Sequence, residues 1–530
     1  MGKIGKYLIE SLTRSMYEDS RCVYREYVQN AADQIDLAKS LHLESNDYYD
    51  IQIWIDQEKK RIEIEDSATG ISKEEIRLLE DVGRSTKTRG KNKGFRGIGR
   101  LGGLGYCSKL VFETSSKGEN TKSIMTWDAT KMNTIVDDES DDSEILEVIE
   151  KCVSYETKDE DSDCHYFKVI MENVTDNKLL DIEAISNYLS MIAPVDYPTR
   201  FSRFGNQIKQ YMKVNGLSLD TYNIFVNGDQ IYKGYTTRIQ NRKDGDYDVT
   251  DIKFFDKKNE SGEFIYWGWY SISELKGQIQ AYNLPYGIRL RCKNIQVGDE
   301  STCRKFFSAD NDKRFSQFFY GELNVVASDL QPDARRDYLR PGDARDSFEK
   351  KVTTDFLVLK ELCYQASGLR SAARNFTSAV NKQKSIEEKR EKGFLNEVER
   401  AKSEQDFVKY QKDSEKYKKQ FAQMKQKSEE AQSPLNFMIQ NLVNSSPSLT
   451  SSSSYLGDKS STTSQINDSS SNTSYDEPKS RLRTDNPLYK KFGPKEKKVI
   501  NSVYSAIYNA IADDQLREIL INKIENEITK

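Results

Sequence analysis

Tyr24-Arg25-Glu26-Tyr27-Val28-Gln29-Asn30-Ala31-Ala32-Asp33 is the stretch of this 530-residue chain that most strongly indicates its fold. Glu26, Asn30 and Asp33 stand at positions i, i+4 and i+7, so a helix with about 3.6 residues per turn places them on one face. Two carboxylates and a carboxamide aligned in this way can activate a water molecule, ligate a magnesium ion and hydrogen-bond a nucleotide. A solvated helix face would show the same spacing, so the choice between these interpretations depends on the motifs that follow.

The second motif is Ile62-Glu63-Ile64-Glu65-Asp66-Ser67-Ala68-Thr69-Gly70-Ile71-Ser72. Its alternation predicts a strand that ends near Asp66, where a carboxylate can accept a hydrogen bond from an adenine amino group. Gly70 would let the backbone approach the base closely, because glycine has no Cβ atom. An ordinary strand-turn-helix corner, with Ser72 as the N-cap and Glu75 closing a capping box, is compatible with the same residues.

The third motif is Gly83-Arg84-Ser85-Thr86-Lys87, followed by Gly94-Phe95-Arg96-Gly97-Ile98-Gly99-Arg100. Its glycines can turn successive backbone N–H groups toward phosphate oxygens, and its lysine and arginines add positive charge. The pattern is neither a P-loop nor a dinucleotide-binding loop that follows a buried strand. A glycine-rich loop alone is weak evidence, but this one follows the other two motifs in order within one domain's length.

Together the three motifs resemble the GHKL ATPases, a superfamily that includes gyrase, the ninety-kilodalton heat-shock chaperones, histidine kinases and MutL. The run from Leu8-Ile9-Glu10-Ser11-Leu12 to Asn30-Ala31-Ala32-Asp33-Gln34 is similar to the opening of those chaperones, and Gly94-Phe95-Arg96-Gly97 is closest to MutL proteins. The resemblance implies an α+β fold with a Bergerat-type ATP-binding domain, in which helices cover one face of a mixed sheet. It also implies ATP and Mg²⁺ as ligands, and hydrolysis of ATP to ADP and phosphate.

The resemblance implies a role for each motif residue. Glu26 would be the general base, Asn30 would ligate magnesium and Asp33 would line the nucleotide pocket. Asp66 would bind the adenine amino group, with Gly70 in the same wall of the pocket. A mobile lid over about 81–105 would contain the remaining nucleotide-binding residues, which are Lys87, Gly94, Gly97 and Gly99.

Two features depart from the family pattern. The family's Asp-x-Gly-x-Gly appears here as Asp66-Ser67-Ala68-Thr69-Gly70, with Ala68 in place of the first glycine, which predicts a modified loop that still functions. The Gly-Thr that the family carries before its last strands has no clear match, and Cys164-His165 falls near that place. A histidine kinase is excluded, because neither His42 nor His165 lies in the context of a phosphoacceptor helix.

A weaker resemblance continues near residues 285–340. Gly287-Ile288-Arg289-Leu290-Arg291 with the following Asn294–Gly298 is similar to a middle-domain strand pair of chaperone-like GHKL proteins. The segment Leu330–Asp337 resembles the loop whose arginine reaches the γ-phosphate. Arg336 is the better candidate for that arginine and Arg335 the second, while a surface pair bonded to neighbouring aspartates would explain the two arginines equally well.

Composition and periodicity divide the chain into five predicted segments. Lys, Glu and Gln with a broken apolar stripe indicate a coiled coil, and a Ser/Thr/Asn-rich tract cannot bury enough apolar surface to fold. The acidic stretch 137–163 is interpreted as an exposed loop. The segments are an ATP-binding domain at 1–175, a second α/β transducer-like middle domain at 176–370, a long helix or coiled coil at 371–432, a disordered linker at 433–485 and a small helical segment at 486–530.

Charge and composition limit the partners and the compartment. A net charge of −4 gives no whole-chain reason to expect nucleic acid, although a nucleic-acid partner stays open. No apolar run approaches the roughly 18 residues that span a membrane, so no membrane partner is expected. Seven cysteines without a CxxC pair, beside two histidines, argue against a zinc site and fit a cytoplasmic location.

The sequence therefore predicts a magnesium-dependent ATPase that closes a homodimeric, chaperone-like clamp on a protein client. One alternative is an ATP-gated nucleic-acid clamp like the Microrchidia ATPases. Another is a nucleotide-gated scaffold with little hydrolysis, in bacterial defence or a stress response. Neither 371–432 nor 486–530 can be assigned as the dimerisation segment from the sequence.

Overall fold

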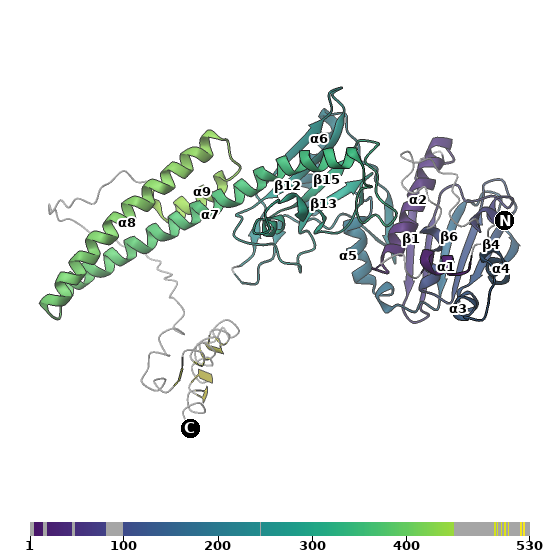
Figure 1. Cartoon of the computed structure of the whole chain (residues 1–530), viewed down its shortest axis with the longest axis horizontal. Coiled ribbons are helices and arrows are strands. Elements are labelled where there is room, and N and C mark those ends of the chain that lie inside the picture. The colour runs from purple at the N-terminus through teal and green to yellow at the C-terminus, as the bar shows by residue number, and fades with distance from the viewer. Residues whose placement is uncertain are drawn as a thin grey trace, which may run out of the picture. The chain divides into compact units, whose positions relative to one another are not determined.

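The computed structural model describes residues 5–13, 18–44, 48–80, 99–243 and 245–449, with scattered residues between 492 and 524. The chain divides into two compact units, Met1–Ser452 and Ser453–Lys530. The first unit has an α+β fold with two β-sheets followed by long helices (Figure 1). In the second unit, Ile500, Tyr504 and Ile521 are buried together among the described residues.

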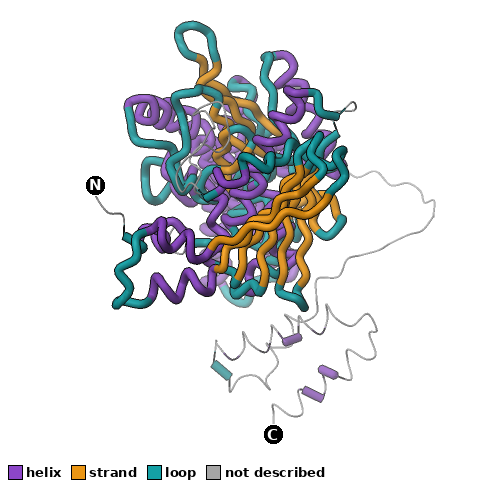
Figure 2. Tube along the Cα trace, turned by 90° about the vertical axis from the view of Figure 1, so that its right-hand side faces the viewer, coloured by secondary structure: helices purple, strands orange, loops and turns teal. Residues whose placement is uncertain are grey.

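The first sheet has eight strands within the described residues, in the order β5-β4-β3-β6-β2-β1-β7-β8, and its strands run side by side in Figure 2. Neighbours are antiparallel except for β1 and β7, which are parallel, so the sheet is mixed. Alternation places Ile51, Ile53 and Ile55 of β1 in the core. The strands are β1 (Asp50–Asp56), β2 (Arg61–Asp66), β3 (Lys109–Ser115), β4 (Thr121–Asp128), β5 (Val153–Asp159), β6 (Tyr166–Glu172), β7 (Asn223–Val226) and β8 (Asp229–Gln230).

Helix α2 (Cys22–Leu41) packs on β1 and β2, and α3 (Ala129–Asp137) packs on β3. The other α-helices before residue 220 are α1 (Tyr7–Thr13), α4 (Ile145–Cys152), α5 (Ile182–Ile192) and α6 (Ser202–Val214). Short 3₁₀ helices are η1 (Ile76–Leu79), η2 (Gly99–Gly105), η3 (Asn177–Leu179) and η4 (Thr199–Phe201). Apolar residues of α2 share one core with the strands, which fixes the helix against the sheet.

The second sheet has the order β11-β12-β15-β13-β14, and β13 runs parallel to β15. Its strands are β11 (Asp251–Lys258), β12 (Phe264–Ile272), β13 (Gly287–Cys292), β14 (Ile295–Gln296) and β15 (Tyr320–Val325). A separate pair is formed by β9 (Arg238–Ile239) and β10 (Tyr247–Asp248), and two 3₁₀ helices are η5 (Thr302–Phe306) and η6 (Lys313–Phe318). Phe348, Val352 and Phe356 bury the start of α7 in the core of this sheet.

Helix α7 (Asp343–Lys392) continues out of this core and pairs with α8 (Glu397–Glu430) as a helical hairpin (Figure 1). Helix α9 (Asn436–Ser445) and η7 (Pro447–Leu449) fold back against them. The long helix therefore begins well before residue 371. The four limits between the predicted segments stay predictions, although β7 beyond residue 175 belongs to the first sheet and α9 lies inside the segment predicted as a linker.

The prediction of an exposed loop over 137–163 is wrong, because α4 and β5 occupy most of this stretch. Ile145, Val148, Ile149 and Cys152 follow each other at helical spacing and are buried, whereas β5 is a mostly exposed edge strand paired with β4. The density of acidic residues reflects the solvent-facing sides of these elements. In the part of the chain that the model describes, no helix is long and apolar enough to cross a membrane.

Candidate active site

The candidate site is built on α2, whose register places the three motif residues along one side of the helix. Glu26 has an exposed fraction of 8% and Asp33 of 3%, whereas Asn30 is half-buried. Val23, Tyr27 and Ala31 are buried in the core that α2 shares with the sheet. The polar side is thus held in a fixed position by the packing of the apolar side.

Glu26 lies between a cation and a glycine. Arg25 Nη2 is 3.3 Å from Glu26 Oε1, and both side chains are largely withdrawn from solvent. A Cβ atom on Gly99 would stand 2.5 Å from Glu26 Oε2, so the start of η2 approaches this carboxylate closely and a side chain at 99 would require Glu26 to shift. Gly99 therefore lies beside Glu26, as expected for residues that serve the same site.

Tyr27 fastens η2 to α2 immediately beside Glu26. Its hydroxyl donates to the Arg100 carbonyl at 3.2 Å and accepts from the Gly103 N–H at 3.1 Å. Burial is the main reason that the pKa of Tyr27 is raised far above its usual range, so this hydroxyl stays protonated and able to donate. The predicted lid residues Lys87, Gly94 and Gly97 lie outside the described residues.

Asp66 is the last residue of β2 and is buried, with an exposed fraction of 3%. Its Oδ1 accepts a hydrogen bond from the Ala68 N–H at 3.2 Å, which forms a tight turn directly after the strand. Ala68 is completely buried, so its methyl group is accommodated where the family pattern has glycine. The loop is modified but still presents a carboxylate at the strand end.

Gly70 has a structural requirement of its own. Its φ is +63°, and a Cβ atom there would stand 1.8 Å from the Ser115 carbonyl oxygen at the end of β3. Beyond it, the Ser72 hydroxyl donates to Glu75 Oε2 at 3.1 Å, but the N-cap of the short helix η1 is Glu75, which makes no side-chain capping hydrogen bond, so the predicted capping box does not form. The close approach that demands glycine is to β3, and the turn after the strand is present whereas the side-chain cap is not.

His165 occupies the place where the family's Gly-Thr would fall. Its Nδ1 is 2.6 Å from the Ala68 carbonyl oxygen and its Nε2 is 2.7 Å from Glu44 Oε1. Thr114 adds a second link, because its hydroxyl donates to the Tyr166 carbonyl and accepts from the Ile71 N–H, both at 2.8 Å. These side chains brace the Asp66 loop, and no sequence motif indicated Thr114.

The loop that carries Arg335 and Arg336 reaches α2 from the second region. Arg336 Nη1 donates to Gln29 Oε1 at 2.7 Å, and Arg25 Nη2 donates to the Arg335 carbonyl at 2.8 Å. Arg336 is 6% exposed and burial lowers its pKa, although Glu26 among its neighbours acts in the opposite direction. The Arg335 side chain is exposed. Burial thus distinguishes Arg336, the better candidate from the sequence, from the exposed Arg335.

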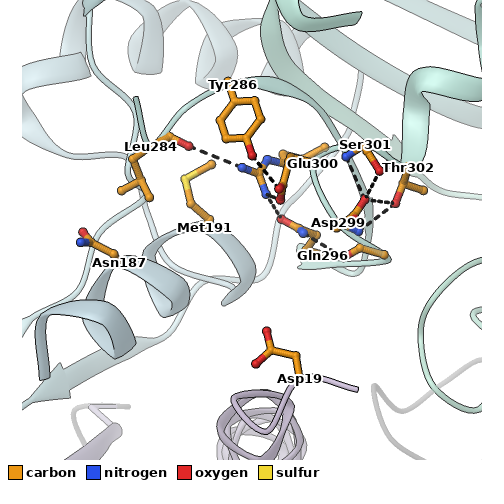
Figure 3. A network of polar contacts seen from close by, with 12 residues as sticks. Asp19, Asn187, Met191, Leu284, Tyr286, Gln296, Asp299, Glu300, Ser301 and Thr302 are labelled. Atoms are coloured by element: carbon orange, nitrogen blue, oxygen red, sulfur yellow. Dashed lines mark hydrogen bonds and ion pairs between the residues drawn. The ribbon is translucent and has the colours of Figure 1, made fainter. Parts of the chain in front are cut away.

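A polar network holds this loop in place (Figure 3). Arg289 Nη1 donates to Gln296 at 3.2 Å and to Glu300 at 3.3 Å, and Gln296 Nε2 donates to the Gly298 carbonyl at 2.9 Å. The Gly298 N–H in turn donates to the Arg336 carbonyl at 2.6 Å. Gly298 has φ of +69°, and a Cβ atom there would stand 2.7 Å from the Asp337 carbonyl oxygen. The backbone of the second region therefore sets where Arg336 lies.

The residues present fit a nucleotide with magnesium. Asp66 offers a buried acceptor at a strand end, and Asn30 offers an amide oxygen on the same helix as Glu26. Among the described residues no group of three or more His, Cys, Asp or Glu side chains could hold a metal ion. Mg²⁺ commonly binds through one or two protein oxygens together with substrate phosphates, so a single ligand such as Asn30 is compatible with this ion.

The comparison with protein families agrees with this geometry. Residues 20–158 match the family described as histidine kinase-, DNA gyrase B-, and HSP90-like ATPase. This stretch therefore forms a GHKL-type ATP-binding domain, and it contains α2 and the strands from β1 to β4 with most of β5. The prediction of a GHKL-type domain is confirmed for residues 20–158, and the predicted α+β fold is confirmed. No curated protein matched the chain.

Proposed function

We propose that the protein is a magnesium-dependent ATPase in which Glu26 is the general base. The observation that carries the proposal is the position of this carboxylate, on a buried helix of the ATPase-type domain and in contact with the glycine that begins η2. A general base must lie within hydrogen-bond reach of the attacking water, and a fixed, largely desolvated carboxylate meets this need. Glu26 would take a proton from water as that water attacks the γ-phosphate.

The other residues bind and orient the substrate. Asp66 would accept a hydrogen bond from the adenine amino group, and Asp33 would line the pocket beneath it. Asn30 would ligate magnesium, which when bound neutralises charge on the phosphates. Gly99, with Lys87, Gly94 and Gly97 of the predicted lid, would donate to phosphate oxygens or add positive charge.

We further propose that the second region couples to hydrolysis through Arg336. Its contact with Gln29 lies one helical turn from Glu26, and Arg25 connects Glu26 to the backbone of the same loop. An arginine that is withdrawn from solvent near a general base can stabilise transition-state charge on a phosphoryl group. Docking of the second region would then control turnover.

The action of such coupling would be to open and close a homodimeric clamp. A protein client is the occupant that the sequence favoured, by similarity to chaperones, and it stays a proposal together with the homodimer and the cytoplasmic location. A nucleic-acid occupant is the second candidate, because one surface of the long helices has the charge distribution that such a partner requires.

The test is ATP turnover of the purified full-length protein in magnesium and in chelator, with Glu26→Ala beside it. We expect turnover that needs magnesium and falls about 10²–10⁴-fold in the variant, the usual contribution of a general base, while binding of ATP measured by calorimetry is retained. Glu58→Ala, an exposed glutamate in the β1–β2 turn, is the matched control and should hydrolyse ATP at the wild-type rate. Wild-type turnover in Glu26→Ala would refute the assignment.

The role of Arg336 is tested by comparing two neighbouring variants. Arg336→Ala should lower turnover by about 10³-fold or more, as for other arginines that act on a transferred phosphoryl group. Arg335→Ala removes an exposed side chain and keeps the carbonyl that Arg25 binds, so its turnover should be close to wild type. Equal losses in both variants, or a loss in Arg336→Ala explained by unfolding in a thermal melt, would contradict the coupling.

A further inference from the structure

A groove of about 950 Å³ runs along α7 where α9 packs beside it. Four cationic side chains line it, namely Lys276, Arg370, Arg374 and Lys382. Most of the remaining lining consists of Ser, Thr and Asn side chains, and the described lining contains no acidic and no aromatic residue. This composition differs from that of the chain as a whole, which has a net charge of −4.

The register of α7 produces this composition. Positions 367, 370, 371, 374, 378, 381, 382 and 385 recur at helical spacing, so they form one polar face. Acidic residues of the distal part of α7, such as Glu387, lie outside the lining of the groove. From Arg370 to Lys382 the face extends about 18 Å, at roughly 1.5 Å per residue.

The cations of the groove differ in how far they are already neutralised. Lys276 is paired with Glu274 at 2.5 Å, and Arg370 donates to the Glu274 carbonyl at 2.8 Å. Arg374 is exposed and has no hydrogen-bond or ion-pair partner among the described residues. Lys382 is exposed and lies 5.0 Å from the centre of the Tyr410 ring, a cation–π contact that supplies no counter-charge. Two charges therefore face the groove without a counter-ion from the protein.

We propose that this groove binds the phosphate backbone of a nucleic-acid strand. Cations at intervals of about 6 and 12 Å along a helix suit a polymer with repeated negative charge, whereas a single phosphorylated residue needs a compact cluster. Hydroxyl and amide side chains between them can donate to phosphate and sugar oxygens. Contacts confined to phosphate and sugar carry no sequence information, so binding is independent of sequence. The described lining contains no aromatic residue for base stacking.

This inference does not rest on the proposed ATPase. The groove lies on the same continuous helix whose first turns are buried in the core of the second sheet. A nucleic-acid strand bound in this groove would be attached to the region that carries Arg336. It would then be the molecule that the proposed clamp encloses. Binding of nucleic acid by the groove itself needs neither Glu26 nor ATP hydrolysis.

The experiment is fluorescence anisotropy of the full-length protein with labelled oligothymidylate and with a labelled random duplex, over a series of salt concentrations. We expect affinity to fall with salt, because neutralised phosphates release counter-ions. Arg374→Ala and Lys382→Ala should each weaken binding and reduce the log–log salt slope by about 1. Lys384→Ala is the matched control, since Lys384 is exposed on the same helix but does not line the groove.

Other outcomes would overturn the proposal. Absence of salt-dependent binding to either oligonucleotide would do so, and so would equal losses in Lys384→Ala and the two groove variants. Binding only to a phosphopeptide or to vesicles of anionic lipid would assign the groove to another partner. Glu26→Ala should bind DNA as the wild type does, so failure of this proposal and failure of the ATPase assignment give separate signatures. Circular dichroism checks that each variant is folded.

Discussion

Two buried glutamates of this molecule, Glu26 on α2 and Glu322 on β15, each face an arginine but differ in how completely they are satisfied. Glu322 is fully buried, and Lys233 Nζ at 2.8 Å and Arg291 Nε at 2.6 Å both approach its Oε1. Tyr197 donates to its Oε2 at 2.8 Å. Glu26 keeps some exposure, and Arg25 Nη2 contacts its Oε1 at a long 3.3 Å.

The difference agrees with a structural task for Glu322 and with the catalytic role proposed for Glu26. Burial alone would raise the pKa of Glu322, but Arg291 and Lys233 lower it to about 2, so it stays ionised. Burial lowers the pKa of Lys233 to about 7, and the neighbouring Arg291 acts in the same direction. A carboxylate surrounded in this way has no acceptor capacity left for a substrate or water, whereas the carboxylate of Glu26 has fewer partners.

The largest expected effect is a fall in the free energy of unfolding when the buried charge of Glu322 is removed. Glu322→Gln would leave Lys233 and Arg291 buried without a counter-charge, and removing one partner of a buried pair costs about 3–5 kcal/mol. The free energy of unfolding in urea measures this. Glu349→Gln breaks the half-exposed contact with Lys305 and is the control, with a change of at most about 1 kcal/mol. Equal stabilities of the two variants would show that the buried Glu322 cluster stabilises the fold no more than a half-exposed ion pair does.

The same cluster predicts a dependence on pH. The pKa of Glu322 falls from 4.5 to about 2 on folding, so its contribution to stability is complete above 4.5 and is lost as the pH falls toward 2. Stability of the wild type relative to Glu322→Gln should therefore shrink as the pH falls from 4.5 toward 2. Urea unfolding at a series of acidic pH values tests the prediction, and a difference that persists unchanged at low pH would contradict it.

A smaller effect is expected at the base-binding end of the candidate site. Asp66→Asn should weaken ATP binding by about 1.5–3 kcal/mol, the usual range for a hydrogen bond to a charged group. Calorimetric titration with ATP measures it. Glu65→Gln alters the preceding residue, which pairs with Lys168 at 2.7 Å, and should leave nucleotide affinity unchanged. Unchanged affinity in Asp66→Asn would remove Asp66 from the adenine site.

The smallest expected effect comes from changing Gly298, which holds the loop that carries Arg336. Gly298→Ala forces a methyl group against Thr302 and the Asp337 carbonyl, which adds strain of about 1–3 kcal/mol and displaces the loop that carries Arg336. Gly216→Ala is the control, because Gly216 also has a positive φ but open space around its Cβ position. Turnover should fall in Gly298→Ala beyond any change in Gly216→Ala. Equal turnover would show that the position of the loop does not matter.

Several features of the fold and site followed from local patterns. The helix around Glu26, the strand that ends at Asp66 and the strand pair within 287–298 were predicted, because the side-chain periodicity of a helix or strand is visible in consecutive residues. Helix α4 and strand β5 were not predicted, because the many acidic residues on their solvent-facing sides obscured the short pattern of buried residues. The start of α7 at Asp343 was likewise missed, because its first turns are buried by the second sheet.

The sequence by itself determined the ATPase-type domain, the shared face of Glu26, Asn30 and Asp33, and the candidate residues, since these depend on spacing along one element. Only the tertiary structure decided that Arg336 is the buried arginine, that Gly70 is required by β3, and that β7 joins the first sheet. It also decided that Arg374 and Lys382 line one groove beside α9, and the described lining of this groove contains no acidic residue. Each of these is a contact between residues distant in sequence, which local periodicity does not encode.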